Sequence, residues 1–295
     1  MERKLAHPGF WMAVVLVFLA LGVQIVLAMP FGIIDVVLEQ VLHKPLLHLE
    51  RQPLIVGCIN LVAFGAAIAL GLFLNRLPFR KAFPFARIAP AQFVAMVVLV
   101  LGVEVVLSEL DNAFRALLPP PWWLLNILQD ILFHDNQLLS RVFLLVIVAP
   151  LTEELLFRGI IFRGLLSRFR PVAAIVITAL LFAVVHLNPW QFFSALLLGV
   201  ALGWFYLRTV SIALCVLAHA FMNALTIVFG ALPWHISGMT SDDLSRVEFQ
   251  PWWLDLSGLA MVLAGIWAFR KATPCPHTDD MPVPPVITPS CGIVP

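Results

Sequence analysis

Val148-Ala-Pro-Leu-Thr-Glu-Glu-Leu-Leu-Phe-Arg158 is the stretch that decides the fold, because it places two glutamates and an arginine inside a long apolar run. An ionisable side chain at the centre of a bilayer costs roughly 2.5–3.5 kcal/mol on insertion scales, so three of them in one span require an explanation. On a helix, Glu154 and Arg158 are four residues apart and can form an ion pair, with the glutamate on the favoured N-terminal side. Glu153 is rotated by about 100° and has no partner within the segment, which leaves it available for chemistry.

The composition of the chain is typical of a polytopic membrane protein. Of its 295 residues, 61% are hydrophobic and 12% are charged, whereas a soluble domain has about 25% charged residues. The net charge of +1 gives no indication of a nucleic-acid partner. The four cysteines include no CxxC pair, so neither a zinc knuckle nor a disulfide framework is predicted.

Eight apolar segments are predicted to be membrane spans, which makes the fold class an all-α, polytopic transmembrane helical bundle. The first segment is too long for the hydrophobic region of a signal peptide and is interpreted as an uncleaved anchor. An interfacial helix is expected at 31–42, a surface helix at 124–132 and a disordered tail from Lys271. The predicted spans are 9–29, 54–74, 91–110, 141–166, 171–188, 192–207, 212–229 and 252–269.

The lysines and arginines predict how the bundle is oriented. With eight spans and a cytoplasmic N-terminus, twelve of these residues are cytoplasmic and five lie outside, which is the bias of the positive-inside rule. Both termini are then cytoplasmic. The cytoplasmic set is Arg3, Lys4, Arg76, Arg80, Lys81, Arg87, Arg163, Arg168, Arg170, Arg208, Arg270 and Lys271, and the outer set is Lys44, Arg51, Arg115, Arg141 and Arg246.

Four regions follow from this count. Residues 1–140 hold spans 1 to 3 with their loops, 141–230 hold spans 4 to 7 as a catalytic core, 231–270 hold an outer loop and span 8, and 271–295 form the tail. Glu104, inside span 3, has no partner in its own segment. It is interpreted equally well as a group lining a wet cavity and as a neutral buried acid.

Polar residues at helical spacing also occur in spans 5 and 7. His186 follows Phe182 by one turn, and His219 and Asn223 are four residues apart on one helix face. A single membrane histidine more often forms a hydrogen bond between helices than acts in catalysis. Polar side chains in spans face the interior of a bundle, however, so both histidines, the asparagine and Glu153 are expected to meet.

These groups are suited to hydrolysis by water. A glutamate can act as general base, a histidine can orient or deprotonate the water, and histidine or asparagine donors can hold an oxyanion. A serine or cysteine mechanism is disfavoured, because the serines near span ends have no evident base and Cys215 lies in an apolar run. HExxH is absent, yet Glu153, His186 and His219 are ligand types that suit a divalent metal such as zinc, so a metal stays open.

At these residues the chain resembles the CPBP intramembrane proteases, which include the type II CAAX prenyl endopeptidases and bacteriocin-processing or self-immunity proteins. Their pattern is EExxxR, then FxxxH, then HxxxN. It reads here as Glu153-Glu154-Leu-Leu-Phe-Arg158, Phe182-Ala-Val-Val-His186 and His219-Ala-Phe-Met-Asn223, in the same order. The resemblance covers about 145–225 and implies an intramembrane endopeptidase.

The resemblance also implies a role for each residue. Glu153 would activate water with the help of His186, while His219 and Asn223 would stabilise the oxyanion. Glu154 and Arg158 would be structural or would orient the substrate. The family is commonly called metalloproteases, but the same constellation also works without a metal.

One estimate of depth conflicts with this convergence. At about 1.5 Å per residue, Glu153 lies about 15 Å from Arg163, whereas His186 lies about 22 Å from Pro171 at the same side of the membrane. His186 is therefore predicted about one turn too deep, unless span 5 begins late or tilts.

Two other functions remain open. An ion-coupled transporter also uses intramembrane carboxylates and histidines, but it would have inverted repeats, which the sequence does not show. A non-catalytic scaffold or immunity protein of the same family is the other. The expected partners are the lipid bilayer and a membrane protein or lipidated peptide, and a bacterial inner membrane is the preferred location. Nothing in the sequence shows whether a prenyl group is recognised.

Overall fold

A computed structural model describes residues 8–41, 43, 48–133, 137–240 and 246–273, and these form a bundle of helices without strands. Six of the helices are long and apolar enough to cross a membrane. Together they correspond to predicted spans 1, 2, 3, 6, 7 and 8, so a multi-pass membrane protein is confirmed. They are α1 (Phe10–Gln40), α2 (Pro53–Asn75), α4 (Pro90–Leu117), α10 (Pro189–Thr209), α11 (Ile212–Ala231) and α12 (Trp252–Ala272).

The remaining two predicted spans have a different form. The stretch read as span 4 is a succession of short pieces without a break: α6 (Leu138–Arg141), η2 (Val142–Val148), α7 (Ala149–Glu154), η3 (Leu155–Phe162) and α8 (Arg163–Leu166). Both η2 and η3 are π-helical. We call this succession the composite helix. Span 5 is α9 (Pro171–Val185), which has 15 residues and is shorter than the roughly 20 that a crossing helix needs. A total of eight spans therefore remains a prediction.

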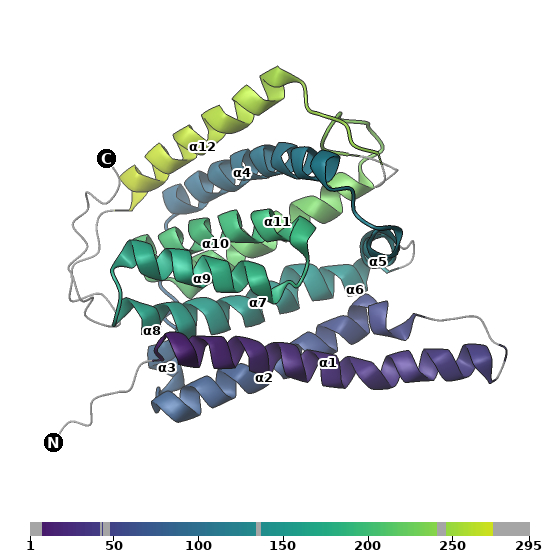
Figure 1. The fold of residues 1–295 in the computed structure, drawn as a ribbon. Helices are drawn as coiled ribbons and strands as arrows, with labels where there is room; N and C mark the ends of the chain where they lie inside the picture. The colour runs from purple at the N-terminus through teal and green to yellow at the C-terminus, as the bar shows by residue number, and fades with distance from the viewer. Residues whose placement is uncertain (1–7, 42, 44–47, 134–136, 241–245, 274–295) are drawn as a thin grey trace.

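The composite helix lies inside the bundle (Figure 1). In this view α12 and α4 run side by side along one edge, and α1 and α2 run along the opposite edge. The composite helix lies next to α1 and α2, and α9, α10 and α11 lie between it and α4. The start of α1 and the end of α12 lie at the same end of the bundle, as an even number of crossings would require. Which side of the membrane that end faces stays a prediction.

The first helix corrects one expectation. We expected a separate interfacial helix at 31–42, but α1 continues without interruption from Phe10 to Gln40 and includes Pro30. A break at Pro30 would free several backbone groups at once, and such groups are costly in lipid. Asp35, near the end of α1, is buried and its carboxylate accepts a hydrogen bond of 2.6 Å from the Leu49 N–H, at the start of the short helix η1 (Leu49–Arg51).

Two more short helices lie in the predicted loops. The basic loop after α2 contains α3 (Phe79–Ala82), and the predicted surface helix is α5 (Trp122–Phe133). The predicted disordered tail begins within α12, which ends at Ala272, and its remaining part, 274–295, lies outside the described residues.

The structure also explains the conflict in depth. The depth of Glu153 was measured to Arg163, whereas the composite helix continues to Leu166, where the predicted span also ends, and α9 begins at Pro171 as predicted. Measured to these ends, Glu153 lies about 20 Å and His186 about 22 Å along their helices, so the two residues are at similar depth. His186 caps the C-terminus of α9, where the chain turns through Leu187 in the left-handed conformation.

Close packing of α4 against α12 depends on glycine. A Cβ atom at Gly102 would lie 2.6 Å from the backbone nitrogen of Val262 and 2.8 Å from the carbonyl oxygen of Gly258. Small residues of this kind allow membrane helices to approach closely, because van der Waals packing drives their association.

We therefore expect Gly102→Ala to destabilise the protein by about 1–3 kcal/mol, because two helix backbones must separate to admit the methyl group. The matched control is Gly22→Ala in α1, where a Cβ would meet nothing within 4 Å. Alanine is the better helix former, so the control is expected to be neutral or slightly more stable. Thermal unfolding of the two variants in detergent measures the difference, and equal midpoints would contradict the prediction.

Candidate active site

Glu154 and Arg158 form the ion pair that their spacing predicts. Arg158 Nη1 donates to Glu154 Oε1 at 2.8 Å, and both side chains are fully buried. The other end of the guanidinium, Nη2, donates to the carbonyl of Gly199 in α10 at 3.0 Å. Arg158 thus connects the composite helix to α10. Gly199 was not among the residues predicted for the site, because its only signal in the sequence is a glycine in an apolar span.

A single phenylalanine ring lies at the centre of this cluster. Phe182 of α9 is fully buried, and the Arg158 guanidinium lies 5.1 Å from the centre of its ring, within the range of a cation–π interaction. The rings of His186 and His219 meet it edge to face, with centroids 5.1 and 5.6 Å away. Phe182 therefore separates the side chains of Arg158, His186 and His219. The FxxxH spacing identified Phe182 but did not predict this role.

Both histidines use Nδ1 for a hydrogen bond within the protein. His219 Nδ1 lies 3.0 Å from Glu154 Oε1, and His186 Nδ1 lies 2.8 Å from the carbonyl of Phe182. Carbonyl and carboxylate oxygens accept, so Nδ1 carries the hydrogen in both rings. In a neutral ring, Nε2 is then the acceptor that remains for chemistry. For Nε2 of His219 to donate to an oxyanion, that ring must carry both hydrogens.

Glu153 is the carboxylate without a structural partner. It is 7% exposed, and its Oε2 is buried with no hydrogen bond within the described part of the chain. His219 and His186 are both close enough to interact with it electrostatically, as are Glu154 and Arg158. The convergence predicted for Glu153 with the two histidines therefore occurs, and Glu153 is the group in it that no hydrogen bond fixes.

Asn223 reaches a backbone carbonyl that the composite helix leaves free. Its Nδ2 donates to Leu145 O at 2.8 Å. Leu145 lies in η2, where the N–H of Ala149 bonds to Leu144 instead. The next residue, Pro150, has no N–H to give. One amide hydrogen of Asn223 is therefore committed to the helix, and the other remains for a ligand.

Replacing Asn223 by leucine is expected to cost about 1–3 kcal/mol of stability, because the Leu145 carbonyl loses its partner. The sharper test is a double-mutant cycle with Pro150→Ala, which supplies a new N–H five residues after Leu145. In that background the cost of Asn223→Leu should fall to less than half. Thermal unfolding in detergent measures all four proteins, and additive effects would contradict this account of the bond.

A metal site is not formed by the predicted ligands. Within the described ranges, no group of three or more His, Cys, Asp or Glu side chains is arranged to hold a metal ion, and Glu153, His186 and His219 are among the residues so tested. Glu154 Oε1 is moreover already bonded to Arg158 and His219. The residues present do not fit a three-ligand metal, and no step is derived through one.

The alternative nucleophile is not placed for attack. Cys215 in α11 is fully buried, and its sulfur lies 3.5 Å from the carbonyl of Leu202. A thiol enclosed in this way has no path to a substrate. Glu104 is half-buried in α4.

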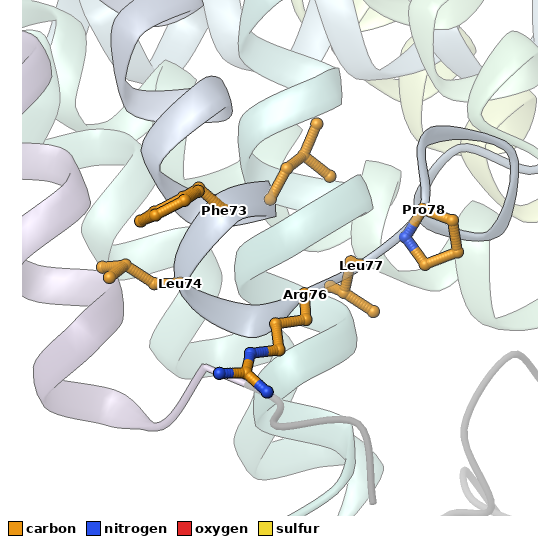
Figure 2. A pocket seen from close by; sticks show the side chains of 6 residues that line it. Phe73, Leu74, Arg76, Leu77 and Pro78 are labelled. Carbon is orange, nitrogen blue, oxygen red and sulfur yellow. The ribbon is translucent and has the colours of Figure 1, made fainter. Parts of the chain in front are cut away.

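A hollow of about 840 Å³ lies at the end of α2. Figure 2 shows the side chains that line it. Leu72, the first residue of its lining, is twelve residues beyond Asn60, which contacts the composite helix, and that is about 18 Å along α2. The hollow is therefore separate from the carboxylate cluster. It is lined by Leu72, Phe73, Leu74, Arg76, Leu77 and Pro78.

Fold and site together define a helical membrane protein with a buried carboxylate–imidazole cluster. Residues 135–225 match the family described as Type II CAAX prenyl endopeptidase Rce1-like. This segment contains all six predicted site residues, so the resemblance to the CPBP proteases is confirmed over it. The matched segment is thus similar to a family of prenyl endopeptidases.

One curated relative adds to this similarity. The UPF0177 protein YxdF of Lactococcus lactis subsp. lactis (strain IL1403) is 31% identical over 87 residues, which are 29% of this chain and 48% of the relative. The chain thus aligns with about half the length of that relative. No solved structure matches the chain.

Proposed function

We propose that the protein is an intramembrane endopeptidase that cleaves a peptide bond of a membrane-associated protein or peptide with a water activated by Glu153. The observation that carries the proposal is the position of Glu153: it is buried, has no hydrogen bond among the described residues and lies near two histidines from separate helices. A structural carboxylate in a membrane would have a partner, as Glu154 does.

In the proposed reaction, Glu153 takes a proton from water while the water oxygen attacks the carbonyl carbon of the substrate. His186 assists by accepting a hydrogen bond from the water at Nε2. The carbonyl oxygen becomes an oxyanion, held by His219 Nε2–H and the free amide hydrogen of Asn223. The C–N bond then breaks, and Glu153 delivers its proton to the leaving nitrogen, which gives a carboxylic acid and an amine.

Glu154 and Arg158 hold the site in place without meeting the substrate. Glu154 fixes the orientation of His219 through Nδ1, and Arg158 holds Glu154 from the other side. Both are fully buried, which supports a positioning role rather than contact with a substrate. A base formed by a glutamate fits this arrangement better than a metal-bound water.

The proposed location is a bacterial inner membrane, which the Lactococcus relative supports. The test compares the membrane peptides of cells that carry the wild type with those of cells that carry Glu153→Ala. We expect at least one protein to be processed only by the wild type. If both cells contain the same peptides but the cellular phenotype of the wild type persists, the non-catalytic alternative replaces this proposal.

A further inference from the structure

Asn60 is a buried amide in the middle of α2, in a span that is otherwise apolar and lies outside the matched segment. It is 8% exposed. Its amide meets Thr152 Oγ1 of α7 at 3.0 Å, and Thr152 directly precedes Glu153. A polar side chain at this depth requires a reason, because it is costly in the bilayer.

The hydrogens of this contact show which end of the amide faces Thr152. Thr152 Oγ1 has one hydrogen and lies 2.8 Å from the carbonyl of Val148, one turn earlier. Donation to that carbonyl is the usual bond of a helical threonine. Thr152 must then accept from Asn60, so we assign Nδ2 to the position that faces Thr152, where the structure has Oδ1, and the amide oxygen to the outward position. Amide nitrogen and oxygen are assigned from such networks.

The outward atom of the amide is unpaired yet reachable. It forms no hydrogen bond with the residues that the structure describes, and it does not belong to the fully buried unpaired atoms. The same holds for the Oε1 atom of Glu153, whereas Oε2 is enclosed. Thr152 and Glu153 are consecutive residues of α7, so the open acceptor from α2 and the one from α7 lie within the length of a short extended peptide.

A peptide entering this site needs such acceptors. In the bilayer an extended chain has N–H groups that water no longer satisfies, and each unsatisfied group costs several kcal/mol. A side-chain amide offers the peptide a neutral acceptor that a carboxylate near Glu153 could not offer without repulsion.

We propose that Asn60 forms a subsite for the backbone of the substrate: its amide oxygen accepts a hydrogen bond from an N–H of an extended peptide that lies across Glu153. The inference rests on the proposed function. Asn60 is then a substrate-binding residue contributed by α2.

The experiment uses the full-length protein and a synthetic peptide that spans the cleavage site found in the comparison with Glu153→Ala. Asn60→Leu is expected to raise KM about tenfold, the loss of one hydrogen bond, and to change kcat less than threefold. Thr152→Val is the matched control, because it breaks the same contact between α2 and α7 but leaves the amide oxygen. We expect its KM to stay within threefold of the wild type.

A second set of peptides separates binding from structure. In each peptide one backbone N–H near the cleavage site is replaced by an ester oxygen. One ester is expected to raise KM about tenfold for the wild type and to have no effect on Asn60→Leu, because the two changes remove the same bond. If Asn60 had only a structural role, Asn60→Leu and Thr152→Val would change KM by the same factor. Each ester would then also change KM equally for the wild type and for Asn60→Leu.

The outcomes distinguish the two proposals. Cleavage by the wild type with an unchanged KM for Asn60→Leu overturns the subsite and leaves the protease intact. No cleavage of any membrane peptide by the wild type overturns the proposed function, and the subsite with it.

Discussion

Glu153→Gln is expected to lower kcat by about 10³-fold or more, while the protein remains folded and inserted. A positioned general base contributes roughly 10²–10⁴-fold, and glutamine keeps the size of the side chain but cannot take a proton from water. Folding should not suffer, because no hydrogen bond within the described residues depends on the Glu153 carboxylate. The measurement is single-turnover cleavage of the identified peptide together with thermal unfolding of the same preparation.

Two further variants serve as comparisons for Glu153→Gln. Glu39→Gln makes the same chemical change at an exposed position of α1 and should leave both rate and stability as they are. His186→Ala should lower the rate by about 10²-fold, a smaller loss, since His186 assists Glu153 and does not replace it. If Glu153→Gln retained more than a tenth of the wild-type rate, Glu153 would not be the base.

The convergence of the motifs was predictable from the sequence because it follows from one rule: polar groups in membrane spans face the interior of the bundle. The i,i+4 spacing of Glu154 and Arg158 likewise identified their ion pair, since side chains four residues apart meet on a helix. Both inferences depend only on residue type and helical periodicity, which the chain displays directly.

Other parts of the site depend on details that periodicity does not contain. A run such as Val142–Val148 reads alike as an α-helix or as a π-helix, yet only the π-helical form, with Pro150 after it, frees the Leu145 carbonyl for Asn223. The bond of Asn60 to Thr152 joins residues 92 positions apart, and no local pattern indicates such a contact. The sequence therefore predicted which residues meet, but not which atoms bond.

The length of α1 was mispredicted for a related reason. Pro30 predicts a helix end in water, where solvent satisfies the freed backbone groups. The helix nevertheless continues through Pro30 to Gln40.

Glu154→Gln is expected to destabilise the protein by about 3–5 kcal/mol, the cost of breaking a fully buried ion pair. Arg158 would remain charged, because a guanidinium does not lose its proton in proteins. Its remaining partners would be the Gly199 carbonyl at 3.0 Å and the face of the Phe182 ring. Neither carries a full negative charge, and Glu153, though close enough to interact with Arg158, forms no hydrogen bond with it, so much of the cost of burying the cation would be uncompensated.

Arg158→Met should cost less than Glu154→Gln, although it breaks the same pair. A carboxyl group can take up a proton, and Glu154 would keep His219 Nδ1 at 3.0 Å as a partner. The double variant with both changes removes the buried charge altogether and should recover part of the loss, since a buried ion pair is often replaceable by apolar groups at little cost. Thermal unfolding in detergent ranks the proteins, with Glu39→Gln at an exposed position of α1 as the neutral control. The contradicting result would be a Glu154→Gln/Arg158→Met protein that is less stable than Glu154→Gln alone. In that case the unpaired Arg158 cation would not be the cause of the cost of Glu154→Gln, and the charges of the pair would themselves stabilise the bundle.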